Sequence, residues 1–479
     1  MAQTALIAGV LGLPVAVAIW LVLIEHGPPS RIRWAVSLTA GGTALCALSL
    51  LPFAGQDLTT PLTWLPTAGP MHLSLATTSL LAITATALAA VVVYVVGTPI
   101  AAGPNAPYGG ALVLIALAAG NLAFLSGHFL LRYVALEIVG LCIAAAPLLK
   151  GSNRERFVHA GWVYLLLRFG DAGLLTAILL LGAETGTFEI GAALEAAATL
   201  PAPMRLWVSL GFFVAVAVKV GVWPFYAWID SGRRLARSTY TWLYATLMPN
   251  LGFYLLYRVA ALPLKTRPLY GALLAFGVGA GMLTLFTLTQ RPSPVHLPAR
   301  STALLGTVIW CAALLGGGKL AWWGLLGLTV VRLPLYLGFP RREEPLADIQ
   351  VTPRWGQWDR NFERFAERLR DEVETGVLDR GPDILAGGLA KTAKSLHATV
   401  EVGILERSLD AMASGLTATT EHLHTAVEKQ SLEGLLRSIV RKVLQGSHQL
   451  QAWHTGRLRA NLWWVVLCLV LAIGLVLAY

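Results

Sequence analysis

The chain has 479 residues, of which 56% are hydrophobic and 13% are charged. A soluble core cannot bury so large an excess of apolar side chains, so the composition excludes an ordinary soluble enzyme. The formal net charge of +10 would suit a nucleic-acid partner, but the lysines and arginines lie in short loops beside apolar runs and in one polar region near the C-terminus. They are therefore interpreted as membrane-topology signals, and no nucleic-acid binding is expected.

Apolar runs long enough to cross a bilayer recur along most of the chain, and they are apolar on all sides rather than alternating in polarity. The sequence therefore predicts an all-α polytopic protein of about 12 transmembrane helices. The predicted spans are 5–25, 33–53, 74–97, 108–125, 128–149, 158–182, 205–229, 238–261, 269–289, 301–316, 320–338 and 461–479.

The charges of the short loops predict the orientation of these helices. Basic loops at Arg31, Lys150 and Arg237 fall on one side, whereas the loop that carries Glu184 and Glu195 falls on the other. Because positively charged loops tend to stay in the cytoplasm, the basic side is expected to be cytoplasmic.

Neither a metal site nor a cofactor site is expected in this chain. All four cysteines lie inside apolar runs, without the spacing of metal ligands. The sequence also lacks a glycine-rich nucleotide loop and a cysteine cluster for iron and sulfur. Any redox chemistry linked to this protein would therefore belong to other chains.

A charged, alanine- and leucine-rich segment at 341–460 interrupts the apolar runs. Its Val-Glu pairs at 373, 400 and 427 recur every 27 residues, and the apolar positions that follow them form helical stripes. The pattern predicts a lateral amphipathic helix on the membrane or on neighbouring subunits, and a soluble coiled coil is disfavoured because the period is not a multiple of seven. Since 27 residues make a half-integral number of turns, interruptions are expected near Gly381-Pro382 and near Gly403 or 424–431.

Ionisable residues inside the predicted spans carry the functional signal, because a charge at the centre of a membrane helix costs about 2.5–3.5 kcal/mol on insertion scales. Glu137 lies in the fifth span and Lys219 in the seventh. Arg168 and Asp171 lie one turn apart in the sixth span, and Arg332 lies in the eleventh. Each of these side chains needs a partner or a water path.

Arg168 and Asp171 can form a self-neutralising structural pair, or they can belong to a transport path. Arg332 can anchor its helix through a carboxylate on a partner subunit. Glu137 and Lys219 have no opposite charge within one turn of their own helices, so they are predicted to approach each other or to share a water chain. Proximity would favour both charged forms, and separation would let Lys219 release a proton.

Pro224 follows Lys219 by five residues in the seventh span. Proline removes a backbone hydrogen bond and disrupts the preceding turn, so a helix break that exposes a carbonyl beside Lys219 is predicted. Broken helices of this kind line ion paths in transporters.

Several motifs resemble the antiporter-like proton-pumping subunits of respiratory complex I and of Mrp-type cation/proton antiporters, most closely the largest, distal subunit. The motifs are Leu136–Leu141, Arg168-Phe-Gly-Asp171, Lys219–Asp230, Gly252–Arg258, Ala299–Thr302 and Leu450–Arg459. In that family the glutamate of the fifth span and the lysine of the seventh form the proton-input pair. The resemblance thus implies that Glu137 and Lys219 form a proton half-channel here.

Two positions depart from the family pattern. Tyr244 stands where the family has a relay histidine, and Arg332 stands where it has a lysine. Arginine stays protonated at accessible pH, so Arg332 cannot relay protons by losing one. Four spans that follow in the family have no counterpart.

The resemblance implies five parts. They are N-terminal helices at 1–107, a five-helix repeat at 108–262, a truncated second repeat at 263–340, the lateral segment at 341–460 and a C-terminal anchor at 461–479. The implied function is a membrane subunit of a complex I-type proton-translocating assembly, with the lipid bilayer and other membrane subunits as partners. The alternatives are a structural bracing subunit with a degenerate channel, and a membrane subunit of another cation/proton or bicarbonate-uptake complex.

Overall fold

The computed structural model describes residues 2–24, 28–59, 72–97, 105–150, 154–232, 235–262, 267–290 and 297–338. The predicted lateral segment at 341–460, with its interruptions, and the predicted span at 461–479 lie outside the described residues.

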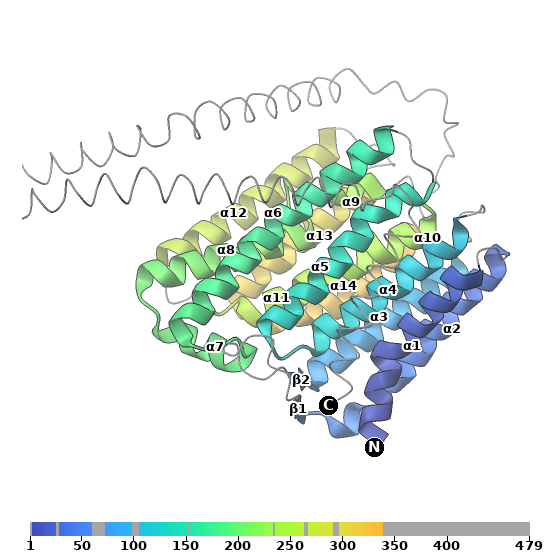
Figure 1. Cartoon of the computed structure of the whole chain (residues 1–479). Helices are drawn as coiled ribbons and strands as arrows, with labels where there is room; N and C mark the ends of the chain where they lie inside the picture. The colour runs from blue at the N-terminus through green and yellow to red at the C-terminus, as the bar shows by residue number, and fades with distance from the viewer. Residues whose placement is uncertain are drawn as a thin grey trace, which may run out of the picture. The chain divides into compact units, whose positions relative to one another are not determined.

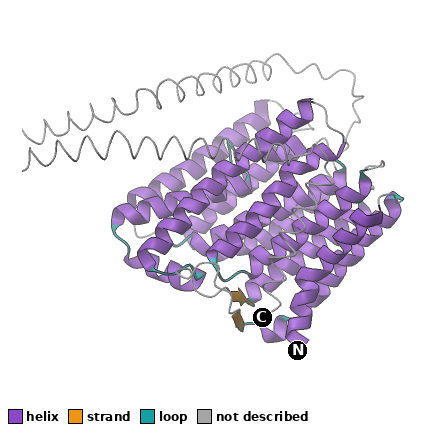
Figure 2. Cartoon of the chain, viewed as in Figure 1, coloured by secondary structure: helices purple, strands orange, loops and turns teal. Residues whose placement is uncertain are grey.

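Long helices run alongside one another through the described part of the chain (Figures 1 and 2). They are α1 (Ala2–Ile24), α2 (Pro29–Ser49), α3 (Thr77–Val96), α4 (Ala106–Leu125), α5 (Phe129–Ala145), α6 (Arg154–Thr185), α8 (Ala202–Val220), α11 (Met248–Val259), α12 (Arg267–Gln290), α13 (Leu297–Gly316) and α14 (Lys319–Gly338). Within the described ranges, nine helices are long and apolar enough to cross a membrane. The predicted all-α, polytopic membrane class is confirmed.

Shorter elements connect these helices. They are η1 (Leu51–Phe53), β1 (Asp57–Thr59), β2 (His72–Ser74), η2 (Ala146–Lys150), α7 (Ile190–Ala196), η3 (Ala197–Thr199), α9 (Ala227–Ser231), α10 (Arg237–Thr239) and η5 (Tyr240–Leu247). The sequence did not predict the strands β1 and β2, which pair antiparallel with Leu58 opposite Leu73. Strands of three residues are too short to leave an alternating pattern in the sequence.

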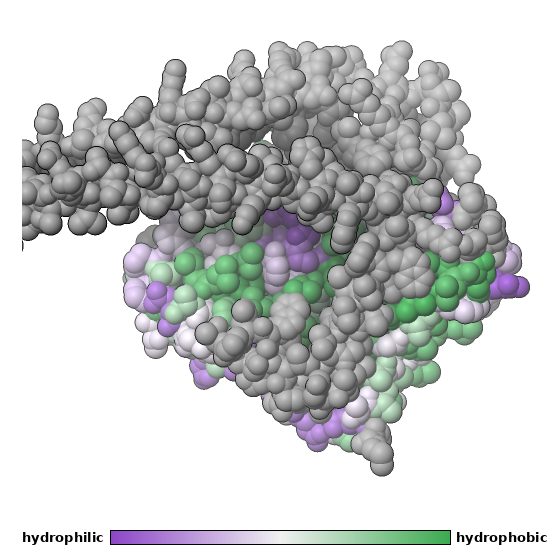
Figure 3. Space-filling model, viewed as in Figure 1, coloured by the Kyte–Doolittle hydropathy of each residue, from purple (hydrophilic) through white to green (hydrophobic). Residues whose placement is uncertain are grey.

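Helices of similar hydropathy differ in how much of their surface the other helices bury. Residues of α4 are apolar all round, as in a helix that is surrounded by others, and 94% of its span is buried. Only 22% of the α12 span is buried, and large side chains such as Met282 and Phe286 are exposed on it. Hydrophobic side chains also cover much of the visible lateral surface of the described helices, as expected for a protein that contacts lipid (Figure 3).

Two predicted spans are interrupted. The seventh was expected to run from 205 to 229, but α8 ends at Val220 because Gly221 adopts the left-handed conformation with φ of 75°. Pro224 lies in the turn that follows, and α9 begins at Ala227. The eighth is built from α10, η5 and α11, of which η5 is a π-helix. Single-turn π segments occur often at functional sites.

Candidate functional site

Four of the charged residues singled out in the sequence meet in one chain of ion pairs, here called the charge network. Glu137 of α5 pairs with Arg168 of α6. Lys219 of α8 donates a hydrogen bond from Nζ to Oδ1 of Asp171 over 2.5 Å. The link between the two pairs is Arg168, whose Nη2 lies 4.0 Å from Oδ2 of Asp171. Charges of alternating sign thus extend across three helices.

The charge network passes from the protein interior toward its surface. The side chain of Lys219 is fully buried and that of Asp171 is 2% exposed. At the other end, the exposed fractions rise to 13% for Glu137 and 26% for Arg168. Arg168 also lies 4.9 Å from the centre of the Tyr164 ring, a cation–π contact on the outer face of α6. Only the Glu137–Arg168 end therefore has access to the surroundings.

Small residues on α6 and α8 allow the buried pair to form. A Cβ added at Gly211 of α8 would lie 2.5 Å from the backbone oxygen of Gly173 of α6, and one at Gly170 would lie 2.8 Å from Val218. Glycine at such contacts lets helix backbones approach closely in membranes. The close approach brings Lys219 within hydrogen-bonding distance of Asp171.

The end of α8 also favours a cation at position 219. Lys219 lies in the last turn of the helix, next to the final residue Val220. The carbonyl groups at a helix C-terminus carry partial negative charge, which stabilises a nearby ammonium group. The positive charge of Lys219 is therefore compensated by two groups, the Asp171 carboxylate and the C-terminal end of α8.

The arrangement of partners differs from the one expected. The sequence predicted that Glu137 and Lys219 approach each other or share a water chain. The structure gives each its own counter-ion on α6, and these two counter-ions lie one turn apart. Arg168 and Asp171, expected to pair with each other, make the longest contact of the charge network at 4.0 Å. Spacing along one helix shows which charges share a face, but it cannot show which neighbouring helix is closer.

The helix break leaves fewer free carbonyls than predicted. The Val218 oxygen accepts a hydrogen bond of 2.7 Å from Nε1 of Trp228 on α9. The Ala217 oxygen accepts bonds from the backbone N–H groups of Gly221 and Val222, at 3.1 and 2.9 Å. The carbonyls at the end of α8 are therefore used inside the protein, and the ionisable group beside the break is Lys219.

Tyr244 lies within the π-helix η5 and is fully buried. Its hydroxyl donates a hydrogen bond of 2.6 Å to the backbone oxygen of Ile143 on α5. Its ring packs against those of Trp228 and Tyr240, with centroids 5.9 and 6.1 Å away. The structure therefore places Tyr244 in a tie between η5 and α5, apart from the charge network.

We expect Tyr244→Phe to lower the free energy of unfolding by about 1 kcal/mol, because the Ile143 carbonyl loses its donor. Chemical unfolding in detergent micelles measures the change. The matched control is Tyr270→Phe, because the Tyr270 hydroxyl has no hydrogen bond to the described residues and its loss should change stability by less. Equal stability of the Tyr244 variant and the parent protein would show that the tie is not structural.

Arg332 of α14 is also fully buried. It donates a hydrogen bond of 3.2 Å from Nη1 to the Ala245 oxygen, and its guanidinium lies 5.2 Å from the centre of the Phe253 ring. The sequence suggested an anchoring carboxylate on a partner subunit. Within the described residues it contacts a carbonyl and an aromatic ring of the same chain, and its Nε and Nη2 have no hydrogen-bond partner there.

Sequence reasoning missed two polar groups. Asn250 of α11 donates to Thr86 of α3 at 3.2 Å and to Thr329 of α14 at 2.9 Å, which ties three helices together. Arg132 and Arg258 line a cavity at one end of the bundle. Arg258 ends one of the motifs quoted above, Arg132 lies four residues before another, and arginine near the end of an apolar run is the signal that could have marked them.

The comparisons with known proteins agree with this architecture. Residues 126–293, which include the charge network, match the family model described as NADH:quinone oxidoreductase/Mrp antiporter, TM. A curated relative, NADH-quinone oxidoreductase subunit N of Paraburkholderia phymatum, is 31% identical over 113 residues, or 23% of this chain and 23% of that protein. The matched region therefore spans less than a quarter of the relative.

Two solved structures share the fold. A chain in the structure of the Mrp complex from Dietzia sp. aligns with a TM-score of 0.59 at 21% identity, covering 68% of this chain and 37% of that chain. A chain of respiratory complex I from Thermus thermophilus with bound NADH aligns with a TM-score of 0.57 at 22% identity, covering 69% and 70%. The resemblance drawn from the motifs is confirmed at family level: residues 126–293 match the NADH:quinone oxidoreductase/Mrp antiporter model, and the described helices share the fold of these two chains.

Proposed function

We propose that this chain is a membrane subunit of a complex I-type proton-translocating assembly, and that the charge network is its proton half-channel. The observation that carries the proposal is the fully buried Lys219, held at 2.5 Å by the single carboxylate of Asp171. A buried lysine changes its proton affinity strongly when a counter-ion moves, so this pair is suited to hold and release a proton.

Each member of the charge network has a separate part in the proposed transfer. Glu137 is at the more exposed end and would exchange protons with the surroundings. Arg168 remains protonated and provides a fixed positive charge between the two carboxylates. A proton that neutralises Glu137 would free Arg168 to attract Asp171, which would weaken the hold of Asp171 on Lys219. Protonation of Glu137 would thereby favour release of a proton from Lys219 at the other end of the charge network.

Partners and orientation follow from the same proposal. The structural relatives named above are chains of multisubunit membrane complexes, and this chain would likewise adjoin other membrane subunits in the inner membrane. Its basic loops would face the cytoplasm. The residues at 108–262 would form the first antiporter-like repeat, those at 263–340 part of the second, and those at 341–460 a lateral brace.

A structural subunit with a degenerate channel is the second candidate. Tyr244 and Arg332, at positions where the family has titratable relay residues, are both engaged in contacts with backbone oxygens. Arg332 cannot release a proton at accessible pH, so a complete path would need another exit. The intact charge network argues against this reading. A related cation/proton or bicarbonate-uptake complex is a third candidate, which the neighbouring genes would distinguish.

We expect Glu137→Gln to lower the number of protons translocated per turnover, because glutamine cannot take up a proton at the accessible end of the charge network. The measurement is proton uptake into liposomes that contain the fully assembled complex. Glu184→Gln is the matched control, because Glu184 lies exposed at the end of α6. An unchanged proton ratio in an assembled Glu137→Gln complex would favour the structural candidate.

A further inference from the structure

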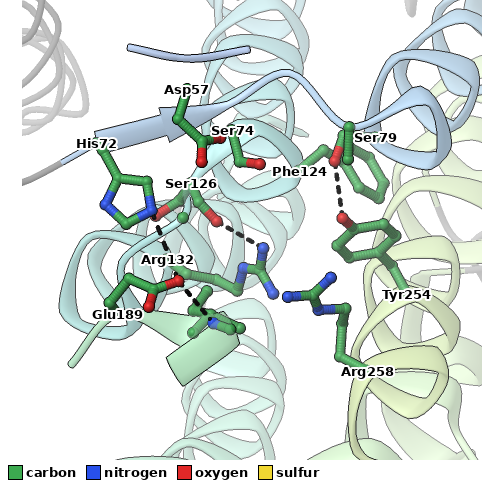
Figure 4. Close-up of a pocket in the computed structure, with 14 residues that line it drawn as sticks. Asp57, His72, Ser74, Ser79, Phe124, Ser126, Arg132, Glu189, Tyr254 and Arg258 are labelled. Atoms are coloured by element: carbon green, nitrogen blue, oxygen red, sulfur yellow. Dashed lines mark hydrogen bonds and ion pairs between the residues drawn. The ribbon is translucent and has the colours of Figure 1, made fainter. Parts of the chain in front are cut away.

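A polar cavity of about 170 Å³ lies away from the charge network, at the end of the bundle that carries β1, β2 and α7 (Figures 1 and 4). Its lining comes from loop and helix ends that are distant in the sequence: Asp57, His72, Ser74, Ser79, Ser126, Arg132, Glu189, Tyr254 and Arg258 contribute side chains. Since one water occupies about 30 Å³ of liquid, the cavity has room for a small polar group together with a few waters.

Arg132, at the start of α5, is fixed in place on three sides. Its Nε donates to the Ala123 oxygen at 3.0 Å, and its Nη2 donates to the Ser126 oxygen at 2.6 Å. Its guanidinium lies 5.2 Å from the centre of the Tyr254 ring. The side chain is only 5% exposed, yet its Nη1 has no hydrogen-bond partner among the described residues. A fixed, buried donor therefore remains unused.

Arg258, near the end of α11, brings a second positive charge into the same cavity. Figure 4 shows its guanidinium directed toward that of Arg132. Within the described residues, neither arginine has an ion-pair contact with a carboxylate, since the pairs there involve other residues. Among the described residues, the two guanidinium groups thus face each other without an ion-paired carboxylate, although Asp57 also lines the cavity, and their repulsion is unfavourable in a partly desolvated site.

The carboxylate of Glu189, also in the lining, is engaged elsewhere. Its two oxygens accept hydrogen bonds of 2.9 Å from the backbone N–H groups of Gly191 and Ala192 at the start of α7. One of these oxygens also lies 3.9 Å from Nε2 of His72. Glu189 therefore caps α7, and Figure 4 places it on the side of His72, away from Arg258.

We propose that this cavity is an oxyanion site in which Arg132 and Arg258 bind a phosphate group. Guanidinium groups present forked donors that match phosphate oxygens, and two of them approaching from different helices suit a tetrahedral anion. The phosphate can belong to an anionic lipid headgroup, since the cavity lies at the ends of membrane helices, or it can be free inorganic phosphate. The site is separate from the charge network and does not depend on the proposed proton path.

The test measures thermal unfolding of the full chain with two sources of phosphate. The first arm compares sodium phosphate with sodium chloride at equal ionic strength. The second compares nanodiscs of phosphatidylglycerol with nanodiscs of phosphatidylcholine. Arg258→Gln removes one of the two cations, and Arg31→Gln is the matched control, because Arg31 is exposed and starts α2 at the opposite end of that helix from β1.

A ligand at 100 times its dissociation constant stabilises the folded state by about 2.7 kcal/mol, which is a shift of several degrees in a scan. A shift with phosphate that disappears in Arg258→Gln and persists in Arg31→Gln supports the proposal and identifies free phosphate. A shift confined to phosphatidylglycerol, with the same dependence on Arg258, supports it and identifies a lipid headgroup. No shift in either arm, or equal shifts in both variants, overturns the proposal.

Discussion

Replacing Lys219 with methionine should destabilise the folded protein by about 3–5 kcal/mol, because it leaves the Asp171 carboxylate buried without its nearest counter-ion. Asp171 is 1% exposed, and the remaining cation, Arg168, is 4.0 Å away and already paired with Glu137. Asp171→Asn should have a comparable effect, because it leaves the Lys219 ammonium group buried. Chemical unfolding in micelles provides the free energies.

The double variant Lys219→Met/Asp171→Asn separates stability from transport. Removing both charges eliminates the unpaired ion, so most of the lost stability should return, and the double-mutant cycle should give a large favourable coupling. Proton translocation should not return, because neither remaining side chain titrates. A stable double variant that still translocates protons at the parent ratio would show that this pair is not on the path. Additive losses would show that the pair does not act as a unit.

Replacing Gly211 with valine should have the second largest effect, at about 3 kcal/mol. The added side chain would meet the Gly173 backbone oxygen and the Ala177 side chain, at 2.5 and 2.9 Å from its Cβ. Backbone atoms cannot move aside as a flexible side chain does, so α6 and α8 must separate. Lys219 and Asp171 face each other across that same interface, and their contact should lengthen.

The control for this prediction is Gly161→Val on α6, because a Cβ at Gly161 meets nothing within 4 Å. That variant should fold with stability close to the parent protein. A second double-mutant cycle tests whether the contact lengthens. The coupling free energy between Lys219 and Asp171 should be smaller in the Gly211→Val background than in the parent protein. Equal stability of the two glycine variants would show that the α6–α8 contact tolerates a wider spacing.

The sequence predicted where the helices lie along the chain, but it did not predict which charged residues of different helices form ion pairs. Helices are present at all eleven predicted spans that fall in the described ranges, because runs of apolar residues report burial in lipid directly. The charge at position 219 was singled out for the same reason. Glu137 was predicted to lie near it or to share a water chain with it, and the structure pairs it with Asp171. The cost of an isolated charge indicates that a partner exists but not which helix supplies it.

Two further features lay beyond sequence reasoning. The π-helix η5 depends on how the backbone between Tyr240 and Leu247 packs against neighbouring helices, and no residue pattern marks it. The facing of Arg132 and Arg258 requires the start of α5 to meet the end of α11, a contact between segments more than a hundred residues apart. Arg258 belongs to a family motif and Arg132 lies four residues before another, but a motif does not show which residues of different segments lie together.

The contacts of α14 have a consequence for biosynthesis. This helix is not among those that qualify as membrane spans by length and hydropathy. An arginine near the centre of a helix makes its insertion into the membrane less favourable by about 2.5–3.5 kcal/mol. Its polar groups find partners on helices made earlier: Arg332 at the Ala245 oxygen, and Thr329 at Asn250. Because translation runs from the N-terminus, these partner groups are already synthesised when α14 leaves the ribosome. We therefore expect α14 to enter the membrane by docking against helices synthesised earlier, rather than by its own partitioning into lipid.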